Sequence, residues 1–409
     1  MRILILSHGY PPTISGVTLV VQKVAREMVR RGHEVTVVAA SDRGEAYQDE
    51  DQGVKLWRVR SIPNPFWSEG PLPMLSYSEL KEIVAEIQPD VVNTHEAALL
   101  SWQLNRLEQE KIDIPDILTC HFLPGFVHYY VRMGKRLERI LENVTWEYTI
   151  RIINGFDHVI FPTRTQQQAF IQEGLEAPST VISNGLDTKR FSPQEDHDNN
   201  VEARYALPAG PRILFVGRLA KDKKIDVLIE AISRVNVSNN AHLILVGRGD
   251  DRERLETLTA SLGMQGQIHF LGFVPEEDLP AIYRHSDIFA IASTVEVQSI
   301  PTLEAASTGL PIVAADAAAL PELVHNDQNG FLVPPGDRKG FAEAIQKILD
   351  NQEKIPDFAR ASLAIGHKHS EVGTFQAYET LYREISLTKL DQDQMPESVN
   401  HYIISGNCD

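Results

Sequence analysis

The sequence predicts an α/β protein made of two Rossmann-like, doubly wound domains that face one another across a cleft. Short, uniformly apolar, β-branched runs alternate with longer segments of helical period, which is typical of parallel strands covered by helices on both faces. The alternation stops at a polar linker and then begins again, giving two series of similar size. The length of 409 residues is ample for two such domains.

The first series begins with an apolar run over residues 3–6, which we predict to be a buried strand. A segment of helical period over 17–31 follows, and Gly32 then turns the chain into a second strand over 35–39. Further strands are expected over 90–93, 116–120, 157–161 and 180–182. These elements form a predicted first domain over residues 1–190.

The second series follows a turn at Asn184–Asp187 and a linker over 193–203 that carries four acids and no base. Its expected strands are 212–216, 243–246, 268–271, 288–291 and 312–314. We assign residues 191–369 to the second domain, residues 370–387 to a last helix, and residues 388–409 to an acidic, flexible tail. Ligands of doubly wound sheets bind at the carboxyl ends of the strands, so we expect the active site there, in the cleft between the domains.

Charge and cysteine content argue against several classes of protein. The net charge is −17, whereas proteins that bind nucleic acid carry a broad basic surface. No run approaches the ~20 apolar residues that span a bilayer. Two cysteines cannot form a disulfide framework, which fits a reducing compartment. We therefore expect a cytoplasmic globular protein with no nucleic-acid partner.

One loop with two cations follows a predicted strand of the second domain. The strand ends at Gly217, and Arg218 and Lys223 precede the next helix. A guanidinium fork and a compact ammonium together suit a diphosphate. An ordinary loop with solvated lysines explains the same spacing equally well.

A second stretch carries two glutamates around a predicted helix start. Ser299 occupies a capping position and Pro301 suits a first turn, so the free N–H groups of this helix would receive phosphate oxygens. Glu304 lies one turn in, where a carboxylate accepts two ribose hydroxyls, and Glu296 in the preceding loop can reach a second sugar. Taken alone, the stretch is better explained by solvated glutamates that stabilise a helix start.

Together the two stretches resemble glycosyltransferase family 4. They share its Gly-Arg-Leu at residues 217–219, its lysine five residues after the arginine, and its two glutamates separated by seven residues. Further segments similar to that family are Ser15–Val17, Asn184–Asp187, Leu245–Gly249, Leu271–Val274 and Gly330–Asp337. The resemblance covers roughly residues 1–387.

This resemblance implies the GT-B fold, a nucleotide-sugar donor held mainly by the second domain, retaining transfer, and a last helix that crosses back to the first domain. Arg218 and Lys223 would hold the diphosphate, Glu304 the ribose and Glu296 the sugar hydroxyls. The remaining donor-binding positions implied by the family are Gly16, Val274, Ser299 and Ile300. Catalytic roles are carried over to His121, Arg218, Lys223 and Glu296.

Three positions add to this comparison. Lys224 stands where the family usually has glycine after the lysine, and residues 296–299 read Glu-Val-Gln-Ser where the family often reads Glu-Gly-Phe-Gly. The second departure concerns the residues that line the sugar pocket. His121 ends a predicted strand; without context it is a structural histidine, whereas the resemblance gives it a role in positioning the donor sugar.

A basic segment follows His121. Residues 132–139 hold four bases and one acid, and apolar residues from Met133 to Val144 recur on one helical stripe. A surface helix packed on its own domain is the alternative explanation. The segments around it resemble the branch that glucosylates diacylglycerol, which implies a membrane or acceptor role for Arg132, Lys135, Arg136 and Arg139.

We therefore expect a retaining hexosyltransferase that moves glucose from UDP-glucose to diacylglycerol at the inner face of the plasma membrane. Phosphatidylinositol, a soluble sugar or polysaccharide as acceptor remains an alternative, as does a non-catalytic nucleotide-sugar-binding protein. The glutamate spacing disfavours a sugar-nucleotide epimerase, no lysine context suits the pyridoxal phosphate of a phosphorylase, and no Gly-x-Gly-x-x-Gly follows the first strand. Cofactors and metals are not expected, because the Asp-x-Asp triplets at 49–51, 196–198 and 391–393 are predicted in polar loops or the tail.

Overall fold

The computed structural model describes residues 1–13, 15–64, 70–95, 99–110, 112, 114–126, 135–194, 200–235 and 240–394. The chain forms two compact units. Unit 1 takes residues 1–162 and 166–182 and the chain from Phe375 onward, and unit 2 takes residues 163–165 and 183–374. The first unit thus ends at residue 182, eight residues before the predicted boundary at 190, because the Asn184–Asp187 turn is grouped with unit 2.

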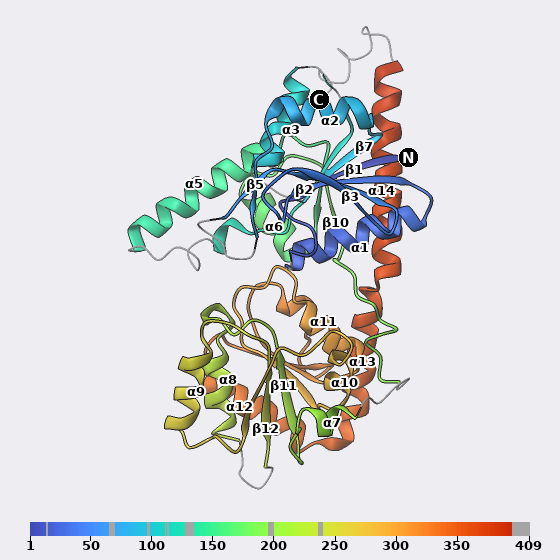
Figure 1. Cartoon of the computed structure of the whole chain (residues 1–409). Coiled ribbons are helices and arrows are strands. Elements are labelled where there is room, and N and C mark those ends of the chain that lie inside the picture. Colours follow the sequence, from blue (N-terminus) through green and yellow to red (C-terminus); the bar gives the residue numbers. More distant parts are fainter. Residues whose placement is uncertain are drawn as a thin grey trace, which may run out of the picture. The chain divides into compact units, whose positions relative to one another are not determined.

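Unit 1 contains an eight-stranded sheet in the order β10-β9-β8-β7-β1-β2-β4-β3 (Figure 1). The strands are β1 (Arg2–Leu6), β2 (Glu34–Ala40), β3 (Tyr47–Asp51), β4 (Val54–Val59), β7 (Val91–Thr94), β8 (Asp116–Thr119), β9 (His158–Phe161) and β10 (Ser179–Val181). All neighbours are parallel except β3 and β4. A separate two-stranded sheet joins β5 (Ser61–Ile62) to β6 (Leu72–Pro73).

Alternate residues of the central strand face two different cores. Ile3 and Ile5 pack with the buried faces of α1 (Gly16–Arg30) and α14 (Glu371–Gln394). Leu4 and Leu6 pack on the other face, in the core shared with α2 (Tyr77–Ile87), α3 (Leu99–Gln109) and α5 (Lys135–Ile153). Helix α6 (Arg164–Gln172) lies in this unit from Gln166 onward. Burial on both faces explains why these strands are uniformly apolar.

Unit 2 contains a six-stranded, fully parallel sheet in the order β13-β12-β11-β14-β15-β16. Its strands are β11 (Arg212–Val216), β12 (His242–Val246), β13 (Ile268–Gly272), β14 (Ile288–Ile291), β15 (Ile312–Ala315) and β16 (Gly330–Val333). Its helices are α7 (Val201–Arg204), α8 (Ile225–Ile232), α9 (Arg252–Ser261), α10 (Leu279–Arg284), α11 (Ile300–Ser307), α12 (Arg338–Leu349) and α13 (Ile355–Lys368). This strand order is that of a doubly wound Rossmann sheet, with its reversal between β11 and β14. The predicted α/β class with two Rossmann-like domains is confirmed.

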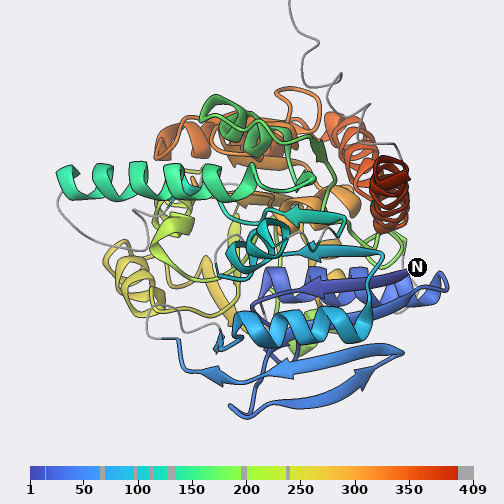
Figure 2. The ribbon, with the colours of Figure 1, turned by 90° about the horizontal axis from the view of Figure 1, so that it is seen from above.

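Two sequence-based placements differ from the structure. Asp49 and Asp51 were expected in a polar loop, but they lie in the edge strand β3, where Asp51 accepts hydrogen bonds from Tyr10, Gln22 and Arg26. Helix α14 continues to Gln394, so seven residues of the expected tail, with Asp391 and Asp393, are helical. Both Figure 1 and Figure 2 show this helix beside the N-terminal strand. Asp196 and Asp198 lie outside the described residues.

Among the helices that the structure describes, none is long and apolar enough to cross a membrane.

Candidate active site

The loops after β11, β12 and β13 are joined by main-chain hydrogen bonds. Leu219 N donates to Arg248 O at 2.8 Å, and Gly247 N donates to Gly272 O at 2.7 Å. A Cβ atom at Gly247, whose φ is +135°, would lie 1.9 Å from Gly217 O, so only glycine allows this approach. The loop that carries the predicted cations is therefore held by its neighbours.

Lys223 and Glu296 form an ion pair at the carboxyl edge of this sheet. Lys223 Nζ lies 2.6 Å from Glu296 Oε1, and their side chains are 19% and 10% exposed. Burial by itself lowers the pKa of Lys223, but the Glu296 carboxylate outweighs burial and raises it above its usual value. Because these residues follow β11 and β14, they meet where the strand order reverses, the usual ligand position in such sheets.

Arg218 lies in the same loop and is more open. Its side chain is 45% exposed, and its Nη2 lies 3.5 Å from Asp222 Oδ1. Asp222 Oδ2 is also 3.9 Å from Lys223 Nζ. The structure thus brings the two predicted diphosphate ligands and the predicted sugar ligand into one charged cluster. Asp222, a member that sequence reasoning missed, carries no signal beyond its place between the cations.

Helix α11 begins where the sequence predicts. Ser299 caps it by accepting a hydrogen bond from Thr302 N at 3.4 Å, and Ile300 is its first residue. Glu304 lies in the second turn, and its Oε2 accepts a hydrogen bond from the Tyr283 hydroxyl at 2.7 Å. Burial raises the pKa of Tyr283 well above its usual value, so the phenol remains a donor. Tyr283 was not predicted, because it belongs to a different helix.

Gln298, the residue that departs from the family, is turned toward the start of unit 2. Its Oε1 accepts a hydrogen bond from Asn184 N at 2.8 Å, and its Nε2 donates to Ser183 Oγ at 3.0 Å. This amide therefore links the loop that carries Glu296 to the Asn184–Asp187 turn.

The predicted base-binding position, Val274, is buried, but its neighbour Phe273 is not. Phe273 follows β13 directly and is 59% exposed, and the Arg248 guanidinium lies 5.4 Å from the centre of its ring. An exposed ring backed by a cation offers a flat surface for a base. The signal for it was an aromatic residue placed directly after a strand end.

In unit 1, His121 lies beside a second histidine. His121 follows β8, His95 follows β7, and His95 Nδ1 lies 2.9 Å from His121 Nε2 with the rings stacked. Burial lowers the pKa of His121 to about 4 and that of His95 well below its usual value. Gly16 is the first residue of α1, and a Cβ there would meet nothing within 4 Å among the described residues. His95 was missed, although it lies only two residues beyond the end of a predicted strand.

Helix α5 carries the basic residues of the predicted membrane segment, and it extends away from the sheet in Figures 1 and 2. Arg136 and Arg139 are exposed on it. Lys135 is its first residue, whereas Arg132 lies outside the described residues. Four large apolar side chains are exposed along it, namely Leu137 (51%), Ile140 (53%), Val144 (57%) and Tyr148 (47%). Of the predicted stripe, Leu137, Ile140 and Val144 are thus about half exposed, whereas Leu141 is half-buried and Met133 lies outside the described residues.

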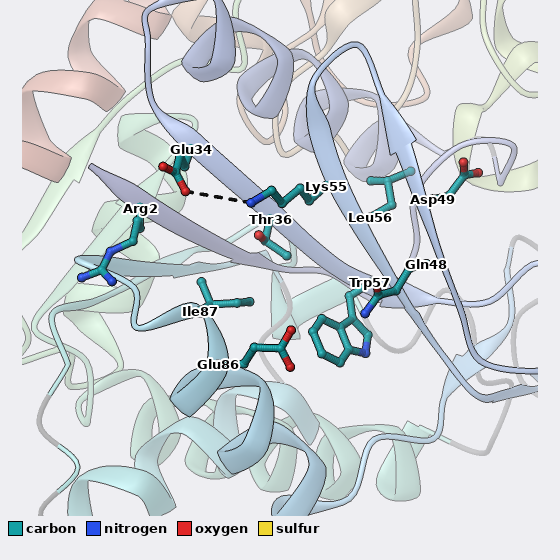
Figure 3. A pocket seen from close by; sticks show the side chains of 10 residues that line it. All are labelled: Arg2, Glu34, Thr36, Gln48, Asp49, Lys55, Leu56, Trp57, Glu86 and Ile87. Carbon is teal, nitrogen blue, oxygen red and sulfur yellow. Dashed lines mark ion pairs between the residues drawn. The ribbon is translucent and has the colours of Figure 1, made fainter.

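A hollow of about 390 Å³ lies at the amino ends of β1, β2 and β4 (Figure 3). Trp57 and Glu86 point into it, and the pair of Lys55 and Glu34 spans one side. It contains none of the predicted site residues, because those follow the carboxyl ends of the strands.

Known proteins resemble this chain over most of its length. A family model for group 1 glycosyl transferases matches residues 200–362, and one for glycosyltransferase family 4 matches residues 14–190. A glycosyltransferase of Methanocaldococcus jannaschii is 27% identical over 86% of this chain and 90% of its own length. The alpha-monoglucosyldiacylglycerol synthase of Acholeplasma laidlawii is 26% identical over 94% of this chain and 97% of its own length.

Two solved structures show the same fold. Sucrose-phosphate synthase from Thermosynechococcus elongatus gives a TM-score of 0.79 at 20% identity, over 95% of this chain and all of the other. The Anabaena protein HepE in complex with UDP-glucose gives a TM-score of 0.72 at 22% identity, over 96% of this chain and all of the HepE chain.

Fold and matches define a GT-B glycosyltransferase, an enzyme that transfers sugar from a nucleotide-sugar donor. The chain belongs to glycosyltransferase family 4.

Proposed function

We propose that this enzyme transfers a hexose, glucose from UDP-glucose, with retention of configuration and without a metal. The observation that carries the proposal is the cluster of Arg218, Lys223 and Glu296 at the strand-order reversal of unit 2. Two cations and the capped start of α11 supply the positive charge that a metal ion supplies to a diphosphate elsewhere. The names of the M. tuberculosis alpha-mannosyltransferase and of the Acholeplasma synthase, both alpha-linking, support retention.

In this mechanism the donor competes for an ion pair that the free enzyme already holds. The diphosphate draws Lys223 from Glu296, and the carboxylate freed in this way accepts a hydrogen bond from a hydroxyl of the sugar. As the glycosidic bond breaks, Arg218 and Lys223 stabilise the charge that develops on the leaving oxygen. That oxygen takes the proton of the acceptor hydroxyl on the same face, so no separate protein base is required. His121 positions the sugar.

The product decides between this proposal and its alternatives. The protein would be incubated with a panel of labelled nucleotide sugars and a lipid extract, and the labelled product identified. A labelled glycolipid from UDP-glucose is expected. A binding protein would instead retain UDP without hydrolysing or transferring the sugar, and a soluble acceptor would leave the label outside the lipid fraction.

Replacing Tyr283 by Phe is expected to weaken UDP binding by about fivefold to tenfold, the worth of one hydrogen bond to a carboxylate. Without the phenol, Glu304 loses the donor that fixes it toward the ribose. Calorimetric titration with UDP and with 2′-deoxy-UDP measures this, and the deoxy ligand should show a smaller loss. Tyr205→Phe is the matched control, because it removes a similar 2.7 Å bond to Asp278 and contacts no predicted site residue. Equal losses of affinity for UDP and for 2′-deoxy-UDP would show that Glu304 does not bind the ribose.

We propose a lipid acceptor, diacylglycerol, because α5 exposes an apolar stripe flanked by cations. Leu137, Ile140 and Val144 can enter the acyl boundary while Arg136 and Arg139 meet anionic headgroups. One exposed helix face of this kind is unusual for a surface in contact with water alone.

Flotation with anionic liposomes tests this surface. Neutralising Arg136 and Arg139 to Gln is expected to weaken binding roughly thirtyfold, at about 1 kcal/mol for each cation. Lys339→Gln/Lys347→Gln on α12 is the matched control, since both lysines are exposed helix cations. Binding that is insensitive to salt, or equal losses in the two variants, would exclude a membrane role for α5 and leave the donor site unaffected.

A further inference from the structure

His95 and His121 form a coupled pair at the carboxyl edge of the sheet in unit 1. Their facing nitrogens, His95 Nδ1 and His121 Nε2, are 2.9 Å apart, and the rings are stacked with an interplanar angle of 17°. His95 is the inner ring, 3% exposed, whereas His121 is partly exposed. Only His121 can therefore meet a ligand, and His95 can act on that ligand only through it.

The short distance requires one hydrogen between the two facing nitrogens. Burial lowers the pKa of both imidazoles, with His8 adding to the effect, so both rings are neutral near pH 7. A neutral imidazole carries one hydrogen, so the ring that donates across the gap has a bare outer nitrogen, and the ring that accepts has a protonated one. The two rings therefore have only two joint arrangements.

The outer nitrogen of His95 distinguishes the two arrangements. His95 Nε2 is buried and has no hydrogen-bond partner among the described residues. If His121 Nε2–H donated to His95, the proton of His95 would lie on this nitrogen as a buried N–H without an acceptor. If His95 Nδ1–H donates, the nitrogen is an unfilled acceptor instead. Orphaned buried donors are the rarer of the two in folded proteins.

We propose that His95 is a positioning residue that donates through Nδ1–H to His121 Nε2 and so holds His121 as the Nδ1–H tautomer. His121 then presents a hydrogen-bond donor to its ligand, which suits an oxygen of the donor sugar. The contact of the His121 Nδ1–H group with the sugar rests on the proposed function, whereas the tautomer of His121 does not.

Nitrogen NMR of the ¹⁵N-histidine-labelled protein at neutral pH tests the tautomer directly. Protonated and bare ring nitrogens resonate far apart, and the His121→Asn variant identifies the His121 signals by their loss. We expect His121 Nδ1 to carry the hydrogen and His121 Nε2 to be bare. A hydrogen on His121 Nε2 would overturn the proposal, whatever the activity of the protein.

Three substitutions at His95 separate positioning from simple packing. In His95→Asn the amide N–H replaces Nδ1–H, so His121 is expected to keep its tautomer and turnover to stay within about threefold. The ionised carboxylate of His95→Asp can only accept, which draws the hydrogen onto His121 Nε2, and His95→Leu leaves that nitrogen unpaired. Both should lower turnover about tenfold, the worth of one hydrogen bond. Equal effects of all three variants, with His121 unchanged in the spectra, would reduce His95 to a packing role.

The same measurements distinguish this inference from the proposed function. The expected tautomer in a protein that transfers no sugar would contradict the proposed function alone. Transfer with a hydrogen on His121 Nε2 would contradict the tautomer alone. Thermal unfolding of each variant shows which spectra report on folded protein. The tautomer itself is read from the unaltered chain, and His121→Asn serves only to assign the His121 signals.

Discussion

Lys223→Ala is expected to lower turnover by about a hundredfold or more, the scale of losing one preorganised group that stabilises developing charge. Lys223 is the most constrained cation of the site, because it lies 2.6 Å from Glu296 at the edge where β11 and β14 end. Steady-state kinetics with the identified donor measure the effect. Arg218→Ala is expected to have a similar effect on turnover, although that side chain is 45% exposed.

Two further variants show whether turnover falls in Lys223→Ala because the charge of the lysine is lost or because the protein is destabilised. Lys221→Ala removes an exposed cation from the same loop and should keep turnover within about twofold. Lys223→Ala leaves Glu296 unpaired, so Lys223→Ala/Glu296→Gln removes both charges and should regain stability without regaining turnover. Near-normal rates in Arg218→Ala and Lys223→Ala would show that the diphosphate does not bind at this cluster.

Gly247→Ala is expected to destabilise the fold by about 2 kcal/mol or more and to abolish donor binding. Its Cβ would lie 1.9 Å from the carbonyl oxygen of Gly217, and the φ of +135° strains any side chain. Because the contacted atoms of Gly217 all belong to the main chain, the loop of Arg218 must move. Urea unfolding gives the free-energy change, and titration with UDP gives the binding loss.

Gly266→Ala is the matched control for the glycine prediction. A Cβ at Gly266 would meet no atom within 4 Å among the described residues, so the change in unfolding free energy should stay within about 0.5 kcal/mol. A Gly247→Ala variant as stable as this control would show that the two loops do not need their close approach.

The central elements were predictable because their signal is local. A strand buried on both faces is continuously apolar, so β1, β11 and β12 stand out in the sequence. The edge strand β3 was not found, since Gln48, Asp49 and Glu50 are exposed and show no apolar alternation. The end of α14 was missed for a related reason, as its last turns are polar and have no apolar period.

The residues of the candidate site also divide into those that the sequence predicted and those that it did not. Arg218, Lys223, Glu296 and Glu304 were found because motifs place them at fixed offsets from strand ends and a helix start. Their partners Asp222 and Tyr283 were not found, nor was His95 beside His121, since each of these residues matters only through a contact. The apolar stripe of α5 was visible as a period, but its exposure was not, because a period does not say which face is covered.

Local sequence patterns are enough to predict two series of buried parallel strands and to place the residues expected to bind the donor at their carboxyl ends. The folded arrangement is needed to show that Lys223 meets Glu296, that Tyr283 meets Glu304 and that His95 meets His121. Periodicity and capping act over a few neighbouring residues, whereas these pairs depend on which strands lie side by side. Strand order follows from the packing of a whole sheet, and no single segment encodes it.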